Sequence, residues 1–201
     1  MKKVFRIGIA GYMGAGKSTC ARSFASDGAL IIDADAEAKR LMAGSPAIHA
    51  ALRAAFGEAV VGADGAVRSD LLGPAAFESV DTLLTLNGIT HPPLVERLDA
   101  IVSGCKKTLC ILDAALIPLL GIESWFDLCV WVHAPFETRL KRLAAKRPDV
   151  GEAELVKRMR MQEAVMSAPR GGDWVKVKDG ECREYISGAV ERFKRASSAA
   201  K

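Results

Sequence analysis

The segment that most limits the fold of this chain is GYMGAGKS, at residues 11–18. It follows an apolar run at residues 4–10 and precedes a helical pattern that begins near Lys17. Glycines at such positions let the backbone curl, so that successive N–H groups point at one anion. A strand, a glycine-rich turn ending in lysine and serine, and a helix, in this order, predict a phosphate-binding loop in an α/β protein.

The polar residues of this P-loop have expected roles at a nucleoside triphosphate. We expect Lys17 to reach the β- and γ-phosphates and the Ser18 hydroxyl to ligate Mg²⁺. The following helix directs its positive end at the same place. The order GxxGxG, followed by lysine, disfavours a dinucleotide site, which requires GxGxxG. The residues expected to bind ATP in this loop are Gly11, Gly14, Ala15, Gly16, Lys17, Ser18 and Thr19.

Strands alternate with helices along the rest of the chain, which is typical of a parallel sheet. Residues 108–116 and 127–135 are near-continuous apolar runs, as expected for strands covered on both faces. Residues 174–180 fit a short last strand, followed by a helix over 181–195 and a frayed tail.

The segment of about 37–107 is mostly helical by pattern, with breaks expected at Gly44-Ser45-Pro46, 62–65, Gly73-Pro74 and His91-Pro92. We therefore expect one domain over residues 1–201, with a helical insert beside the sheet. The expected divisions are a core of 1–36, 108–137 and 169–201, an insert of about 37–107, and a helical lid of about 138–168 broken at Arg147-Pro148.

Acidic residues end two of the expected strands. Asp33 and Asp35 follow residues 29–32, and Asp113 ends the run TLCILD. Ligands gather at the carboxyl ends of parallel strands, so these acids should face the P-loop. Asp113 fits a Mg²⁺-holding position, the alternative being a solvated strand end. For Asp33 and Asp35, a base for an acceptor hydroxyl and an N-cap are equally open, and spacing does not choose between the two.

A basic segment follows the fourth expected strand. Arginines that close over a transferring phosphate stabilise its charge, and a lid excludes water. The alternative is a solvated helix face, but the order P-loop, acidic strand end, basic helix favours the lid. We select Arg142 and Arg147 as lid residues and expect Arg147 to bind ATP. The basic residues are Arg139, Lys141, Arg142, Lys146, Arg147, Arg158 and Arg160.

Composition excludes several classes of protein. A net charge of +4 is too small to indicate nucleic-acid binding but suits an anionic small ligand. No apolar run is long enough to span a membrane, and the N-terminus does not resemble a signal peptide. The 5 cysteines include no CxxC pair, so we expect buried free thiols and a reducing, cytoplasmic location.

Taken together, these motifs resemble the dephospho-CoA kinase family over nearly the whole chain. The matching stretches are GYMGAGKST, IIDAD, THP at 90–92, LDAALIPLLGIESWFD at 112–127, VHAPFETRLKRL at 132–143 and RMRMQ at 158–162. Two stretches depart locally from the family: AALIP at 114–118, and Asp179 before Gly180, where members often have Asn-Gly near the adenine.

The resemblance implies a P-loop kinase with a three-layer α/β fold, a parallel central sheet, a helical substrate-binding insert and a basic lid. It implies Mg²⁺- and ATP-dependent phosphorylation of the 3′-hydroxyl of dephospho-CoA by a monomeric enzyme. Asp35 maps to the proposed base and Arg142 to the lid arginine, so the implied catalytic residues are Asp35, Lys17 and Arg142. The insert maps to the CoA-binding part and contains His91. Without the resemblance, a lone histidine at this position is more often a packing or surface residue than a binding one.

Two rival functions follow from the P-loop alone. One is a kinase of the same fold for a nucleotide or sugar-acid acceptor, which the DAD and HP motifs disfavour. The other is a nucleotide-dependent switch with a guanine-reading NKxD motif. That motif is absent, and the only asparagine is Asn87.

Overall fold

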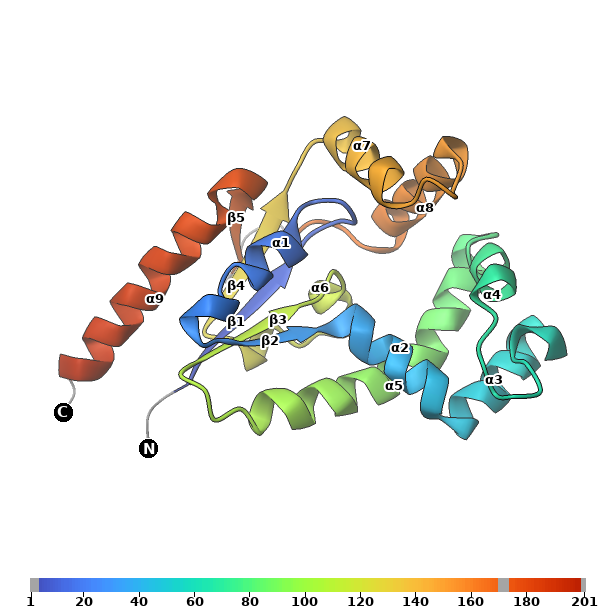
Figure 1. The fold of residues 1–201 in the computed structure, drawn as a ribbon, viewed down its shortest axis with the longest axis horizontal. Coiled ribbons are helices and arrows are strands. Elements are labelled where there is room, and N and C mark those ends of the chain that lie inside the picture. The colour runs from blue at the N-terminus through green and yellow to red at the C-terminus, as the bar shows by residue number, and fades with distance from the viewer. Residues whose placement is uncertain (1–3, 170–173, 200–201) are drawn as a thin grey trace.

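A parallel sheet forms the centre of the protein (Figure 1). The computed structural model describes residues 4–169 and 174–199. Within them the strand order is β2-β3-β1-β4-β5, and every neighbouring pair is parallel, which confirms the α/β prediction. The strands are β1 (Phe5–Ala10), β2 (Leu30–Asp33), β3 (Leu109–Asp113), β4 (Leu128–His133) and β5 (Trp174–Lys178).

Helices connect the strands and flank the sheet. The α-helices are α1 (Lys17–Arg22), α2 (Ala34–Gly44), α3 (Pro46–Phe56), α4 (Ser69–Ala76), α5 (Val80–Ser103), α6 (Ile117–Leu120), α7 (Phe136–Lys146), α8 (Glu152–Val165) and α9 (Cys182–Ala199). Short 3₁₀ turns are η1 (Ala25–Asp27), η2 (Glu58–Val60), η3 (Glu123–Trp125) and η4 (Asp179–Glu181).

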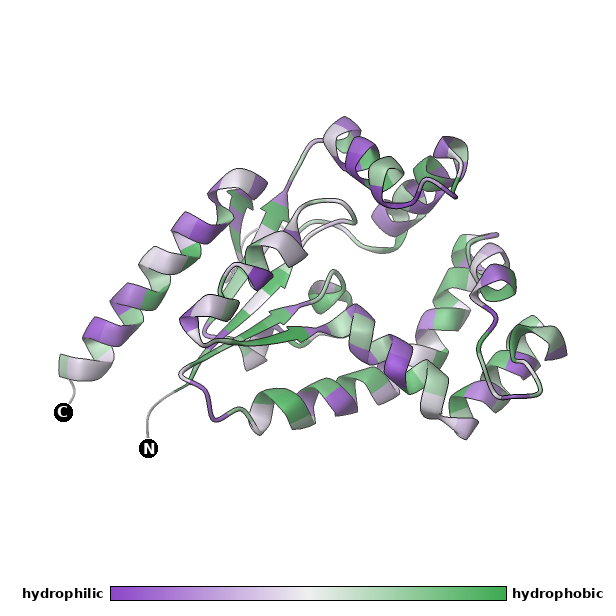
Figure 2. Ribbon diagram, viewed as in Figure 1, coloured by the Kyte–Doolittle hydropathy of each residue, from purple (hydrophilic) through white to green (hydrophobic). Residues whose placement is uncertain are grey.

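Both faces of the sheet are covered, because its strands carry apolar residues at successive positions. On one face, Ile7 and Ile111 pack with Ile186 of α9 and with residues of α1. On the other face, Leu112 and Trp131 pack with α5 and α6. Figure 2 shows the hydrophobic strands between helices that carry many hydrophilic residues, α9 most clearly. This three-layer arrangement holds the carboxyl ends of β1, β2 and β3 at one rim.

Helices α2 to α5 lie beside the sheet and have a small core of their own (Figure 1). Ile48 and Leu52 of α3 pack there with Leu72 of α4. The expected break at Ser45 is confirmed, since Ser45 ends α2 and caps α3 through the Ile48 amide. The division into core, insert and lid remains a prediction.

Two breaks expected in this region are wrong. Gly73-Pro74 lies inside α4, and His91-Pro92 lies inside α5 with Pro93 next to it. A proline removes its own N–H from the helix and disturbs the turn before it, which bends a helix without ending it. Figure 1 shows that α5 changes direction along its length. Burial of Leu94 and Leu98 holds the second half on the sheet.

Smaller differences occur at other helix ends. The helix after the P-loop ends at Arg22, and Gly28 closes η1 instead, with a φ of 76°. The expected break at Arg147-Pro148 separates α7 from α8. Helix α9 continues to Ala199, so the prediction of a frayed tail is wrong for residues 196–199; residues 200 and 201 lie outside the described part.

Candidate active site

The P-loop, residues 11–18, curves tightly between β1 and α1, and its backbone lies close to that of the elements around it. Gly14 has a φ of 77°, and a Cβ at this position would lie 2.7 Å from the carbonyl oxygen of Arg139. A Cβ on Gly11 would lie 2.4 Å from the carbonyl oxygen of Val132. Glycine is therefore required for this close approach as well as for the positive φ.

Lys17 lies at the start of α1 with its ammonium group inside the curve of the loop. Its Nζ donates to the carbonyl oxygen of Tyr12 at 3.2 Å. Burial lowers the pKa of Lys17, against the opposing effect of the Asp113 and Asp35 carboxylates. An ammonium group removed from water interacts more strongly with the negative charge of a polyphosphate than an exposed one does.

Asp113 and Ser18 meet next to this lysine. Asp113 ends β3, is 6% exposed, and is the register partner of Asp33 on β2. Burial raises the pKa of Asp113, while hydrogen bonding by the Ser18 hydroxyl and the charge of Lys17 oppose the rise. The two residues selected from sequence as magnesium ligands thus lie together at the rim.

The oxygens of Ser18 and Asp113 fit a magnesium ion bound mainly by substrate and water. Mg²⁺ prefers oxygen ligands and is usually held by one or two carboxylates plus phosphates. In residues 4–169 and 174–199 there is no group of three or more His, Cys, Asp or Glu that could cage a metal. Ser18 and Asp113 would therefore hold the ion jointly with the triphosphate.

Asp33 and Asp35 differ in their roles at the start of α2. The Asp33 carboxylate accepts from the Ala36 amide at 3.0 Å and caps α2, so the capping alternative is confirmed for this residue. Asp35 lies exposed in the first turn of the same helix. The negative charge of Asp35 opposes the lowering of the Lys17 pKa, so Asp35 lies at the same rim of the sheet as Lys17.

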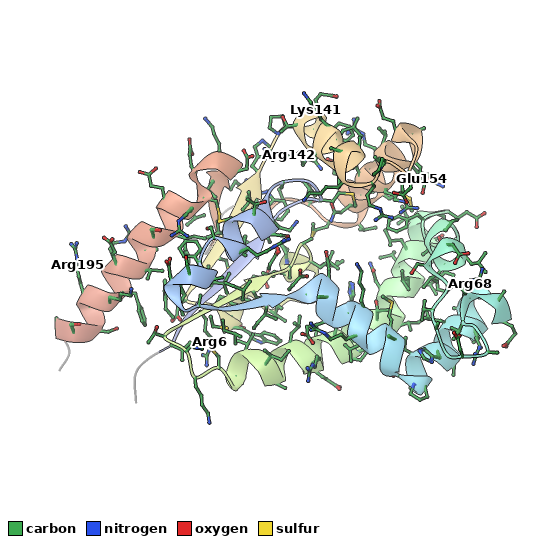
Figure 3. All side chains as sticks on the ribbon, in the orientation of Figure 1. Arg6, Arg68, Lys141, Arg142, Glu154 and Arg195 are labelled. Carbon is green, nitrogen blue, oxygen red and sulfur yellow. A yellow bond between two sulfur atoms is a disulfide. The ribbon has the colours of Figure 1, made fainter. Side chains whose placement is uncertain are left out.

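A cavity of about 530 Å³ opens beside the P-loop. Gly14, Gly16, Thr19, Arg142, Lys146 and Asp179 contribute to its lining. Arg142 of α7 donates to the Gly14 carbonyl oxygen at 3.4 Å and forms an ion pair with Asp179. Figure 3 shows Arg142 on the side of α7 that faces α1, whereas Lys141 points away. The structure thus brings Arg142 to the P-loop.

Comparisons with known proteins identify the family. A dephospho-CoA kinase family model matches residues 5–184. The chain belongs to the dephospho-CoA kinase family. A dephospho-CoA kinase of Corynebacterium efficiens is 38% identical over 150 residues, which cover 72% of this chain and 74% of that protein. One of Porphyromonas gingivalis is 34% identical over 167 residues, covering 83% and 81%.

Solved structures agree with this assignment. A protein of Thermus thermophilus superposes with a TM-score of 0.70 at 29% identity and covers 95% of this chain and 98% of its own. The dephospho-CoA kinase of Campylobacter jejuni has a TM-score of 0.58 at 18% identity, covering 92% and 97%. At that identity the likeness shows the fold alone, and the expected P-loop kinase fold is confirmed.

One basic residue selected from the sequence, Arg147, is not among the residues that line the cavity, and a neighbouring basic residue is. Arg147 follows α7, is exposed, and has Asp149 as its acidic neighbour at 3.9 Å, so the structure does not bring it to the cavity. Lys146 lines the cavity instead, and its charge acts on Lys17. The spacing of four from Arg142, one helical turn, is the sequence signal that points to Lys146.

His91 lies half-buried on α5, and burial lowers its pKa. A neutral imidazole on the insert can donate or accept a hydrogen bond but supplies no fixed charge. Its role in binding the acceptor remains a prediction.

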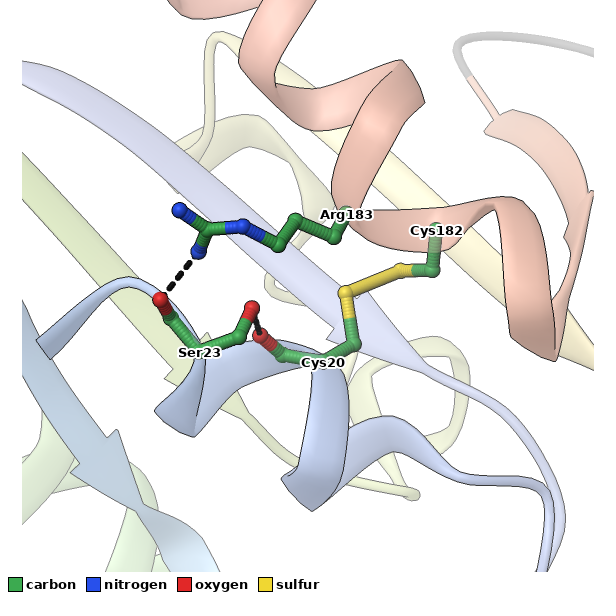
Figure 4. Close-up of a disulfide and its surroundings, with 4 residues drawn as sticks. All are labelled: Cys20, Ser23, Cys182 and Arg183. Carbon is green, nitrogen blue, oxygen red and sulfur yellow. Dashed lines mark hydrogen bonds between the residues drawn. A yellow bond between two sulfur atoms is a disulfide. The ribbon is translucent and has the colours of Figure 1, made fainter.

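The prediction of free cysteines is wrong for two of the five. Cys20 of α1 and Cys182 of α9 form a disulfide with a Cα–Cα distance of 6.1 Å (Figure 4). The partners are 162 positions apart, and sequence spacing does not reveal such a pairing. Next to the bridge, Arg183 donates to the Ser23 carbonyl oxygen, which adds a second link between α1 and α9.

No helix within residues 4–169 and 174–199 combines the length and apolarity needed to cross a bilayer.

Proposed function

We propose that this member of the dephospho-CoA kinase family transfers the γ-phosphate of Mg-ATP to the 3′-hydroxyl of dephospho-CoA, giving coenzyme A and ADP. The observation that carries the proposal is the meeting of four groups at one rim of the sheet. Lys17 and Ser18 of the P-loop lie with Asp113, and the charge of Asp35 reaches Lys17. A triphosphate bound by the first three would have its terminal phosphate near the fourth.

In this proposal Asp35 is the base. Its exposed carboxylate takes the proton of the acceptor hydroxyl as the oxygen attacks phosphorus, and later releases it to water. The Asp33 carboxylate already accepts from the Ala36 amide, so its orientation is set by the helix cap. Asp35, with His91 on α5, would also bind the acceptor.

Two cations stabilise the charge that develops during transfer. Lys17 is desolvated, so its ammonium group interacts strongly with phosphate oxygens. Arg142 presents a guanidinium group next to Gly14 and can bind two oxygens at once. The P-loop from Gly11 to Thr19 would supply backbone N–H donors, and Lys146 takes the place that sequence reasoning assigned to Arg147. When bound, Mg²⁺ would neutralise charge on the phosphates, held by Ser18 and Asp113.

We also propose that the enzyme is a monomer acting in the cytoplasm, with ATP and dephospho-CoA as its partners. In a reducing compartment Cys20 and Cys182 are held as thiols. The disulfide is therefore expected there only under oxidising conditions.

The deciding experiment incubates the protein with Mg-ATP and dephospho-CoA and identifies the product by mass spectrometry and ³¹P NMR. We expect coenzyme A with phosphate on the ribose 3′-oxygen. Lys17→Ala should abolish turnover, whereas Lys194→Ala, an exposed change on α9, should not alter it. ATP hydrolysis without coenzyme A formation would reject the acceptor, and an active Lys17→Ala variant would reject the site.

A further inference from the structure

The lid helix α8 holds the tip of the P-loop. The Met13 amide donates to the side-chain oxygen Oε1 of Gln162 at 2.8 Å, a contact between residues 149 positions apart. Gln162 is 9% exposed, so its carbonyl group is withdrawn from water. Met13 is also packed against Leu140 and Met159 of the lid.

Tyr12, the preceding loop residue, makes a second set of contacts with the same region. Its hydroxyl donates to the Met166 carbonyl oxygen and accepts from the Ala168 amide, both at 3.1 Å. The guanidinium group of Arg139, 3% exposed, lies 5.0 Å from the centre of the Tyr12 ring. Both loop positions that the phosphate-binding motif leaves unspecified before Gly14 are therefore bound to the lid.

The Gln162 hydrogen bond lies next to the glycine at which the P-loop turns. Met13 directly precedes Gly14, whose positive φ turns the loop toward Lys17. A hydrogen bond on the Met13 amide restricts rotation of the Tyr12–Met13 peptide and so restricts the direction in which the next N–H groups point. Removing the acceptor leaves a part-buried N–H without its partner, which is unfavourable.

We infer that Gln162 is a positioning residue for phosphoryl transfer: its side-chain carbonyl fixes the P-loop tip in the curve that receives the triphosphate. Tyr12 supports the same curve through its hydroxyl. The inference rests on the proposed binding of a triphosphate by this loop, but not on the identity of the acceptor or of the base.

The test compares two substitutions at one position. Gln162→Met keeps the length of the side chain and removes the acceptor, whereas Gln162→Glu keeps an acceptor oxygen. We expect Gln162→Met to raise the KM for Mg-ATP and the Kd for Mg-ADP about tenfold, with the KM for dephospho-CoA within about twofold of wild type. Gln162→Glu should stay within about threefold of wild type for all three constants. Lys157→Ala, an exposed change on the same helix, is the control and should match wild type.

Each result bears on the inference. Unchanged nucleotide constants in a folded Gln162→Met variant would overturn it, as would equal losses for both substrates. If Gln162→Met does not fold, Tyr12→Phe removes two hydrogen bonds and keeps the ring beside Arg139. It should raise the Kd for Mg-ADP about threefold, and no change would overturn the inference. Mg-ADP titration separates this outcome from failure of the proposed function, since a wild-type protein inactive on dephospho-CoA still reports loop geometry.

Discussion

Asp33 and Asp35 stand two positions apart at the same rim, and only one of them is already engaged by the fold. Asp33 caps α2, while the negative charge of Asp35 opposes the lowering of the Lys17 pKa by burial. The resemblance assigns the base to Asp35, and the geometry supplies a reason for that choice. A carboxylate that caps a helix is held in the orientation that the cap requires, whereas a base must turn one oxygen toward the acceptor hydroxyl.

The first prediction concerns this pair. Asp35→Asn should lower kcat by about 10² to 10⁴, the usual contribution of a general base, with the KM for Mg-ATP changed less than about threefold. Asp33→Asn is the matched control, because asparagine also caps helices well. Steady-state kinetics on both variants checks this, and normal turnover by Asp35→Asn would remove Asp35 from the role.

The second prediction concerns Asp113, whose pKa is raised in the fold by burial. A raised pKa means that folding disfavours the carboxylate, so the group destabilises the fold above its folded pKa, and the penalty disappears as pH falls toward the unfolded value. Asp113→Asn should therefore raise the Tm of the nucleotide-free protein at neutral pH. The gain should shrink toward about pH 4, near the ordinary pKa of aspartate.

Differential scanning fluorimetry across this pH range measures the effect, and Mg²⁺-dependent activity is measured in parallel. We expect activity to be lost while stability rises. A variant with a lower Tm at neutral pH would show that Asp113 is stabilised by Lys17 and Ser18 more than it is penalised by burial.

Individual site residues were predictable from the sequence where the chemistry of phosphate and metal binding requires one residue type. Lys17, Ser18 and Asp113 lie together as expected. Lys146 was missed, because a run of basic residues on a helix does not show which of them face inward. The sequence favoured Arg147, which follows the last turn of α7 and is not among the residues that line the cavity.

Among the helices, α8 also contacts the residue that follows α4. The Arg158 guanidinium of α8 lies 5.1 Å from the ring centre of Phe77, which follows α4. Figure 1 shows α8 facing α4 across this junction. Helix α8 thus contacts the P-loop through Gln162 and the residue after α4 through Arg158, one helical turn apart.

The third prediction compares two glycines with nearly the same positive φ. Gly14 and Gly28 have φ values of 77° and 76°, but only Gly14 has backbone atoms of Arg139 where a Cβ would lie. Gly28→Ala should reduce the free energy of unfolding by about 1–2 kcal/mol, the penalty of a left-handed alanine. Gly14→Ala should reduce it further and also weaken Mg-ADP binding, because Arg139 must move.

Urea unfolding and calorimetric titration with Mg-ADP measure both quantities. Equal effects of the two substitutions would mean that the conformation of Gly14 matters and the space around it does not.

The elements themselves were largely predictable, since apolar runs and turn residues mark β1 to β5. The prolines of α5 were misread, because a proline signal alone does not distinguish a bend from an end. After the prolines, Leu94 and Leu98 are buried with Leu112 and Trp131 of the sheet, and this packing is a property of the assembled fold. The pairing of α8 with the P-loop was likewise invisible in the sequence, since Gln162 is far from Met13 along the chain.

At the scale of the whole molecule, the Cys20–Cys182 disulfide joins the two helices that cover one face of the sheet. Reduction should lower the free energy of unfolding by about 2–4 kcal/mol, since the bridge restricts the unfolded chain. The comparison is Tm with and without a phosphine reductant. A Cys20→Ser/Cys182→Ser double variant should not respond to the reductant, whereas Cys105→Ser should respond like wild type. An equal response by the double variant would place the effect elsewhere.

The same bridge decides how the protein would carry mechanical load. If the chain is stretched from points near its two ends, tension passes from Cys20 to Cys182 through the two sulfur atoms. The chain between these cysteines, which are 162 positions apart, is bypassed. A fully extended strand of that length would span roughly 550 Å. The covalent path then runs through β1, part of α1 and α9, and the pairing of β1 with β3 and β4 resists its removal from the sheet. Under such a load the oxidised kinase can lengthen only through the residues outside the bridge. Two-electron reduction of the disulfide adds the segment between Cys20 and Cys182 to the length that can extend.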